Sequence, residues 1–105
     1  MESEIKYLKR IVQKKTGVKL GRKTRKREVV HARRMYYKIM REFYKKSSLH
    51  EIGQTLPLKQ NHATVLHQIN EFAIDYKHDR LFRNKFNSIR NEFYGLTGEP
   101  EVDLE

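Results

Sequence analysis

Hydrophobic residues in the middle of the chain repeat at the spacing of a short amphipathic helix. Leu49, Ile52 and Leu56 recur at intervals of three and four residues, which is typical of one apolar helix face. Ser48 precedes this stripe, and Glu51 lies three residues after Ser48, which is the spacing of a capping box. The pattern predicts a helix that begins just after Ser48.

A break and a second, longer helix follow. Pro57 ends the first helix, because it has no N–H to donate and disfavours helical geometry in the residue before it. Asn61 is the next residue suited to an N-cap. The apolar positions after it keep the helical period: Val65, Ile69, Phe72 and Tyr76. A short helix, a tight turn and a longer helix predict a helix-turn-helix unit.

Three further stripes predict three more helices. One covers residues 2–15, the longest runs from about residue 25 to residue 46, and the last follows a break at residues 75–79, with Asp79 as cap, and ends between Gly95 and Gly98. Their apolar positions are Ile5, Leu8 and Val12; Val29, Ala32, Tyr36, Ile39 and Phe43; and Phe82, Phe86, Ile89, Phe93 and Leu96. No segment alternates with period two, so we expect an all-α fold of about five helices. We expect one domain over residues 1–97 and an acidic, disordered tail at residues 98–105.

Charge is distributed unevenly along the 105 residues, whose formal net charge is +10. Residues 6–46 hold 17 Lys and Arg against two Glu, a local charge of +15, whereas residues 99–105 carry four acidic residues. A basic half of this density indicates a polyanion partner. Nucleic acid is the first candidate, and an anionic membrane surface is the second.

Several function classes find no support in the sequence. The absence of cysteine excludes a disulfide scaffold and cysteine chemistry. No apolar run reaches the roughly 20 residues of a membrane span, and the N-terminus does not resemble a signal peptide, so we expect an intracellular, cytoplasmic protein. There is no glycine-rich phosphate loop, no paired-carboxylate arrangement and no pair of histidines with metal-binding spacing. We therefore expect neither enzyme activity nor a cofactor or metal.

A basic segment, Gly-Arg-Lys-Thr-Arg-Lys-Arg at residues 21–27, contains five cations and no hydrophobic anchor. It is expected to be an exposed loop that follows phosphates or enters the minor groove beside a helix-turn-helix. A solvated connection would have the same composition. The cations of this segment are Arg22, Lys23, Arg25, Lys26 and Arg27.

The second helix of the unit begins with short or hydrogen-bonding side chains. A recognition helix presents its N-terminal residues to base edges in the major groove, and its dipole suits phosphate. The residues concerned are Gln60, Asn61, His62, Ala63 and Thr64. An ordinary capped first turn in solvent would suit the same residues, and both interpretations stay open at this point.

These motifs together resemble the C-terminal DNA-binding domain, domain IV, of the bacterial replication initiator DnaA. That family shows Ser-Leu-x-Glu-Ile-Gly and then Gly-Arg-Asp-His-Thr-Thr-Val-Leu-His. This chain has Ser-Leu-His-Glu-Ile-Gly at 48–53 and Asn-His-Ala-Thr-Val-Leu-His at 61–67. The basic segment at 23–27, Val-His-Ala-Arg at 30–33 and Asp79-x-x-Phe82 occupy similar places, so the resemblance covers roughly residues 3–95.

The resemblance implies a Trp-repressor-like helical domain that binds a short sequence in double-stranded DNA. It implies base reading by Asn61, His62, Ala63 and Thr64. It implies a minor-groove arginine, for which Arg25 is the nearest match, and a backbone contact by Arg33. Lys59, Gln60 and the basic segment complete the expected contacts with the minor groove or the backbone.

The departures from the family motif affect specificity. Asn61 replaces Asp, Ala63 replaces Thr and Gln60 replaces Arg, so the bound sequence is expected to differ from the family's usual site. The turn reads as one residue longer, with Pro57-Leu58 where the family has glycine. The ATPase part of an initiator is missing from this sequence.

The first hypothesis is a sequence-specific module for double-stranded DNA, replication-initiator-like or regulatory and without ATPase activity. We expect it to be a monomer, with a larger replication or regulatory protein as a further candidate partner. The alternative is a basic helical RNA-binding or ribosome-associated protein, which explains the charge equally well but not the motif.

Overall fold

The computed structural model describes residues 2–98, and these residues form five helices and no strand. The helices are α1 (Glu2–Thr16), α2 (Arg27–Phe43), α3 (Leu49–Gln54), α4 (His62–His78) and α5 (Arg80–Thr97). The predicted all-α class and the number of helices are confirmed. The predicted acidic tail lies outside the described residues, apart from Gly98.

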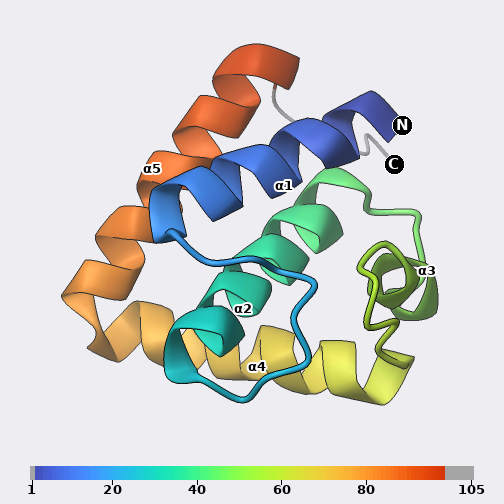
Figure 1. The fold of residues 1–105 in the computed structure, drawn as a ribbon. Helices are drawn as coiled ribbons and strands as arrows, with labels where there is room; N and C mark the ends of the chain where they lie inside the picture. The colour runs from blue at the N-terminus through green and yellow to red at the C-terminus, as the bar shows by residue number, and fades with distance from the viewer. Residues whose placement is uncertain (1, 99–105) are drawn as a thin grey trace, which may run out of the picture.

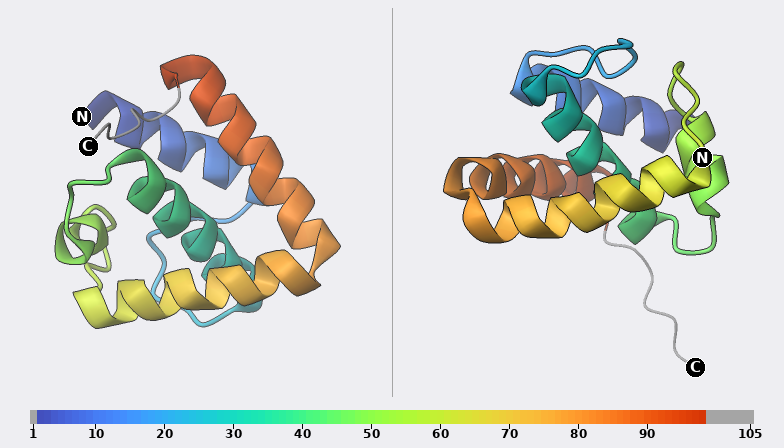
Figure 2. Two further views of the ribbon diagram at one scale, coloured as in Figure 1. Left: turned by 180° about the vertical axis from the view of Figure 1, so that it is seen from behind. Right: turned by 90° about the horizontal axis from the view of Figure 1, so that it is seen from below.

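The second helix is the centre of the fold, because α2 contacts each of the other four helices (Figure 1). α1 packs against α5 on one side, and α4 crosses α2 on the other. The short helix α3 lies at one end, against α2 and the beginning of α4. The view from behind shows α1, α5 and α4 arranged around α2 (Figure 2, left).

Burial along α2 is wider than a single apolar stripe. The predicted positions Val29, Ala32, Tyr36 and Ile39 are buried, but so are Met35, Arg33, Tyr37 and Met40. A helix with partners on several sides buries several of its faces, which periodicity along one face cannot predict. The Tyr36 hydroxyl is satisfied by the Thr55 hydroxyl at 2.7 Å, which ties α2 to the end of α3.

The predicted caps position the helices of the helix-turn-helix. The Ser48 hydroxyl accepts from the Glu51 N–H and the Glu51 carboxylate accepts from the Ser48 N–H, both at 3.1 Å, so the capping box is complete. The Asn61 side chain accepts from the Thr64 N–H at 2.9 Å at the start of α4. Asp79 caps α5 in the same way, through the Phe82 N–H at 3.0 Å. Each cap satisfies a backbone donor that the helix itself leaves unpaired.

The helix that was expected to be the longest has 17 residues, one fewer than α5, and both of its predicted boundaries were wrong by two or three residues. α2 begins at Arg27 rather than near residue 25. The Val29 and Val30 N–H groups donate to the Lys26 carbonyl, so the hydrogen bonds of the helix start at that residue. It ends at Phe43 rather than residue 46. There Arg41 donates to the Ser47 carbonyl at 2.8 Å and holds the following segment in a turn.

The last two helices differ from expectation in two details. α4 continues through Asp75 to His78, so the predicted break narrows to Asp79 alone. α5 ends at Thr97, within the predicted limits of Gly95 and Gly98, and Gly98 follows with a φ of +83°. Leu96 is 62% exposed because it lies one turn beyond Phe93, the last buried residue of this helix.

Candidate nucleic-acid interface

The turn between α3 and α4 passes very close to the backbone of α3. Gly53 is buried on α3, and an ideal Cβ atom there would lie 2.0 Å from the Gln60 carbonyl oxygen. Val65 from α4 approaches the same position, with its methyl carbon 3.0 Å away. The glycine of the Glu-Ile-Gly motif therefore has a physical reason: only a residue without a side chain lets the two helices approach this closely.

The first turn of α4 presents polar side chains to solvent. Asn61, His62 and Ala63 are exposed and Thr64 is half-buried, whereas Val65, one residue further, is fully buried. The four predicted base-reading residues are thus adjacent at one accessible helix end.

Gln60, just before the cap, is tied to the core. The buried Tyr37 hydroxyl donates to Gln60 Oε1 at 2.5 Å. Burial raises the pKa of Tyr37 to about 12, so its hydroxyl keeps its proton and remains a donor at neutral pH. This bond fixes the segment that leads into α4.

The basic segment packs directly against the helix-turn-helix. An ideal Cβ at Gly21 would lie 3.0 Å from Cγ of Pro57, so the start of the segment contacts the proline of the α3–α4 turn. Farther along, Lys23 and Arg25 share a depression of about 480 Å³ with Leu58 and Gln60. The segment and the turn project from the same side of the molecule (Figure 2, right).

Arg33 requires a correction, because we expected it at the DNA backbone. Its side chain is only 5% exposed, and burial lowers its pKa. Its guanidinium donates to the carbonyls of Leu20 at 3.3 Å, of Thr24 at 3.1 Å and of Arg22. Arg33 therefore fixes the conformation of the basic segment from inside the protein. Its charge is directed inward and is not available to a phosphate.

Unlike Arg33, the cations of the basic segment itself face solvent. The exposed side chains are Arg22, Lys23, Arg25, Lys26 and Arg27. Arg27 differs from the rest because it pairs with Asp79 at 3.8 Å, although it stays 77% exposed. An exposed pair of this kind is weak and leaves the arginine available to a polyanion.

The sequence of residues 5–71 matches the family described as bacterial dnaA protein helix-turn-helix. The chain belongs to this family. The matched region begins in α1, includes the basic segment, α2 and α3, and ends within α4. No curated protein matched the sequence, and no solved structure matched it either. The DnaA family assignment means that this helix-turn-helix is a DNA-binding unit.

One departure from the DnaA motif is visible in the backbone. Counting back from His62, Lys59 stands at the glycine of Gly-Arg-Asp-His, and its φ is +47°. The sequence comparison predicts Pro57-Leu58 at the place of that glycine, whereas the left-handed residue is Lys59. A non-glycine residue in this region is under strain of about 1–2 kcal/mol. The turn therefore places a charged residue in a backbone conformation that favours glycine.

A polar cluster between α2 and α4 was not foreseen. Arg34 on α2 donates to Asp75 at 2.7 Å and to Gln68 at 2.7 Å, and both partners lie on α4. His31 adds its imidazole 3.8 Å from the Asp75 carboxylate and an edge-to-face contact with Phe82. Arg34 and Asp75 are 41 positions apart in the sequence. The only sequence feature that pointed to this contact is an arginine next to the apolar stripe of α2. The cluster fixes α4 against the central helix.

Residues 2–98 show neither a metal-binding cluster nor a membrane-spanning helix. No group of three or more metal-binding side chains occurs among residues 2–98. Within the same range, no helix combines the length and the apolar character that a membrane span requires.

Proposed function

We propose that this chain recognises a specific sequence in double-stranded DNA with the first turn of α4 in the major groove. His62 and Thr64 are the principal base-reading residues, with Asn61 and Ala63 beside them. A hydroxyl, an imidazole and a methyl group at the N-terminus of a recognition helix suit base edges.

The basic segment supplies the contacts that do not depend on sequence. Arg22, Lys23, Arg25 and Lys26 are placed to follow phosphates or enter the adjacent minor groove, and Lys59 extends the same charge to the turn. Arg33 and Gln60 act indirectly, because the first shapes the segment and the second anchors the entry to α4.

The observation that carries this proposal is the packing of Gly21 on Pro57. It brings the predicted base-reading helix and the predicted phosphate-binding segment, about 40 residues apart in sequence, onto one surface. We further propose that the chain acts as a binding module and does not hydrolyse ATP, in a replication or regulatory role.

Selection of duplexes from a random pool, at one fixed salt concentration, tests the proposal. Affinities for the selected and a scrambled duplex are then compared for the parent, His62→Ala and Thr64→Ala. Both variants should keep weak, salt-sensitive binding and lose about 1–3 kcal/mol of discrimination each. Failure to enrich any sequence, or equally strong competition by RNA of the same length, would favour a nonspecific or RNA-binding function.

A further inference from the structure

Two amides at the beginning of α4 have their oxygens occupied within the protein. The Thr64 N–H is a donor, so its partner must be Asn61 Oδ1, which it meets at 2.9 Å. Gln60 Oε1 accepts from the Tyr37 hydroxyl at 2.5 Å. Both side chains therefore direct their NH₂ groups away from these bonds, and Asn61 is exposed. Lys59, next to them, has donors only.

We infer that residues 59–61 form a donor-only surface, so that this chain selects guanine opposite Asn61. The inference rests on the proposed function, because it assumes that α4 enters the major groove. Guanine presents two neighbouring acceptors there, O6 and N7, which suit the two N–H bonds of one amide. Cytosine presents an amino donor, which would meet the outward-directed NH₂ groups of these amides and not their oxygens.

Adenine is disfavoured for a separate reason. An asparagine that reads adenine donates to N7 and accepts from N6 at the same time, so it needs both ends of its amide. Here the oxygen already satisfies the Thr64 N–H, and turning it toward a base would leave that donor unpaired. The cap thus converts an ambivalent amide into a donor.

The matched variant is Asn61→Asp. Aspartate caps a helix N-terminus as well as asparagine does, so the fold and the melting temperature should be kept. Its second carboxylate oxygen replaces the NH₂ group and is an acceptor. Toward DNA the side chain then accepts instead of donating, and its added negative charge should weaken binding to every duplex alike.

Selection from a random duplex pool should be carried out for the parent and for Asn61→Asp at the same salt concentration. The parent should enrich guanine over cytosine by about tenfold or more at one position, and the variant should move that position to cytosine. The other enriched positions should stay the same. Tyr37→Phe, which releases the Gln60 oxygen, should relax the preference at the neighbouring base.

The outcomes separate the two levels of the argument. If the parent enriches no sequence, the proposed function fails. If the parent enriches a sequence but Asn61→Asp changes no position, or if adenine is selected at the position that changes, the donor-only inference fails while the proposed function stands.

A second inference comes from α1, independently of these amides. Five cations surround one shallow depression of about 640 Å³ on α1 and the segment after it: Lys6, Lys9, Arg10, Lys14 and Lys19. Among the residues that the structure describes, none of the five forms an ion pair, unlike Lys15, which pairs with Glu92 at 3.5 Å. Like charges gathered without partners repel one another, and a polyanion would relieve that repulsion.

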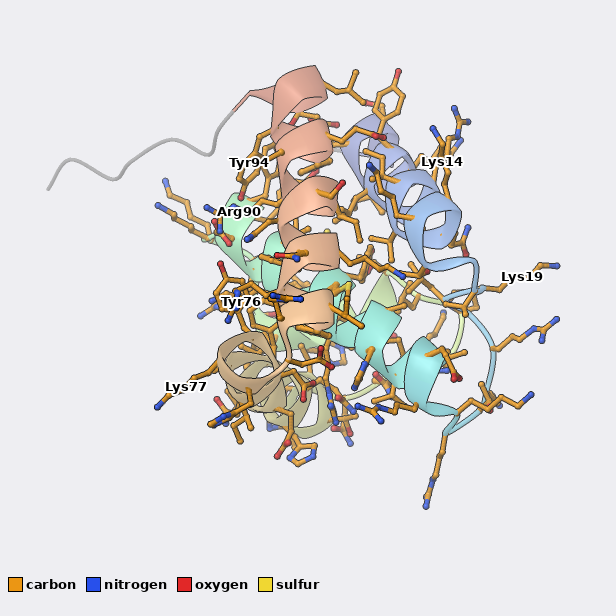
Figure 3. The ribbon with its side chains drawn as sticks, turned by 90° about the vertical axis from the view of Figure 1, so that its left-hand side faces the viewer. Lys14, Lys19, Tyr76, Lys77, Arg90 and Tyr94 are labelled. Carbon is orange, nitrogen blue, oxygen red and sulfur yellow. The ribbon has the colours of Figure 1, made fainter. Side chains whose placement is uncertain are left out.

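The position of this basic depression favours DNA as the polyanion. Lys14 and Lys19 project toward the same side as the basic segment, away from Lys77 and Arg90 (Figure 3). Lys19 is followed within three residues by Arg22, so the charge continues into the proposed phosphate contacts. We infer that the depression binds the phosphate backbone of the same duplex, beyond the bases that α4 reads, an inference that also rests on the proposed function.

Duplex length provides the test. The parent should bind a duplex extended on one side of the selected site more tightly than a duplex limited to that site. The triple variant Lys6→Gln/Lys9→Gln/Lys14→Gln should lose this gain and keep its affinity for the short duplex. Its slope of log K against log salt on the long duplex should fall by roughly 0.9 per lost phosphate contact. A control variant on the opposite side of the molecule, Lys77→Gln/Arg90→Gln, should keep the gain.

Affinity for the short duplex reports on the proposed function, and the gain on extension reports on the basic depression alone. No gain for the parent, or a gain that the α1 variant retains, would overturn this inference. Binding of phosphatidylglycerol vesicles through the same lysines, with no gain on extension, would assign the depression to a membrane surface and would also overturn it.

Discussion

Gly53 and Gln60 meet so closely that an ideal Cβ on the glycine would lie 2.0 Å from the glutamine's carbonyl oxygen. The obstacle is backbone, which cannot swing aside as the end of a flexible side chain can. The contact therefore sets the distance between α3 and the entry to α4, and with it the direction in which the recognition helix leaves the turn.

Gly53→Ala should destabilise the protein by about 1–3 kcal/mol, because the added methyl group forces α3 and the turn apart. Urea denaturation measures the loss. Gly95→Ala is the matched control: this glycine lies inside α5 with nothing within 4 Å of its added Cβ. Alanine there should stabilise the helix by about 0.5–1 kcal/mol. A Gly53→Ala variant as stable as the parent would show that the turn has room to yield.

Lys59 combines backbone strain with an exposed charge, and two variants separate these properties. Lys59→Gly should raise the free energy of unfolding by up to about 1 kcal/mol, since glycine adopts a φ of +47° without strain. Lys59→Gln should leave stability unchanged. Both remove the charge and should weaken DNA binding to a similar extent. Unequal losses of affinity would mean that the shape of the turn, rather than the charge, limits binding.

Arg33 and Arg25 should respond in opposite ways to substitution. Arg33→Met leaves three buried or half-buried carbonyls without their donor and should cost about 1–3 kcal/mol of stability. Arg25→Ala, at an exposed position, should leave the melting temperature unchanged and weaken binding to selected and scrambled duplexes by comparable factors. Thermal denaturation and binding isotherms at one salt concentration measure the two effects. Full affinity in Arg25→Ala would reduce the basic segment to a solvated connection.

Stability should depend on pH through His31. Burial lowers the pKa of His31, and the attraction of Asp75, already engaged by Arg34, only partly opposes this. The neutral imidazole is therefore the native form. Its contribution to stability is present above the unfolded pKa, about 6.5, and is lost as pH falls through the lower native pKa.

The measurement compares urea denaturation at about pH 7.5 and pH 5 for the parent and for His31→Gln. The variant should lose less stability on acidification than the parent does. His67→Gln, which changes an exposed histidine, should follow the parent. Identical pH profiles for the parent and His31→Gln would show that protonation of this imidazole carries no cost in the folded protein.

The sequence by itself determined the features that depend on neighbours a few positions apart. Ser48 with Glu51, Asn61 and Asp79 cap the helices for which they were predicted, because a cap and its partner are three residues apart in the chain. The apolar stripes located all five helices for the same reason, since a helix repeats within four residues. Only their ends shifted, by a few residues.

Tertiary structure alone decided which polar groups are turned inward and which are left available at the surface. The sequence predicts an exposed cation at Arg33, but in the folded protein its guanidinium is covered by the carbonyls of Leu20, Arg22 and Thr24. Arg34 and Asp75 are far apart along the chain, and no local pattern pairs them. Asn61 is ambivalent in the sequence and becomes a donor only when its oxygen meets the Thr64 N–H. Local spacing predicts where a helix begins, but the direction in which an amide or a guanidinium points depends on partners that folding brings together.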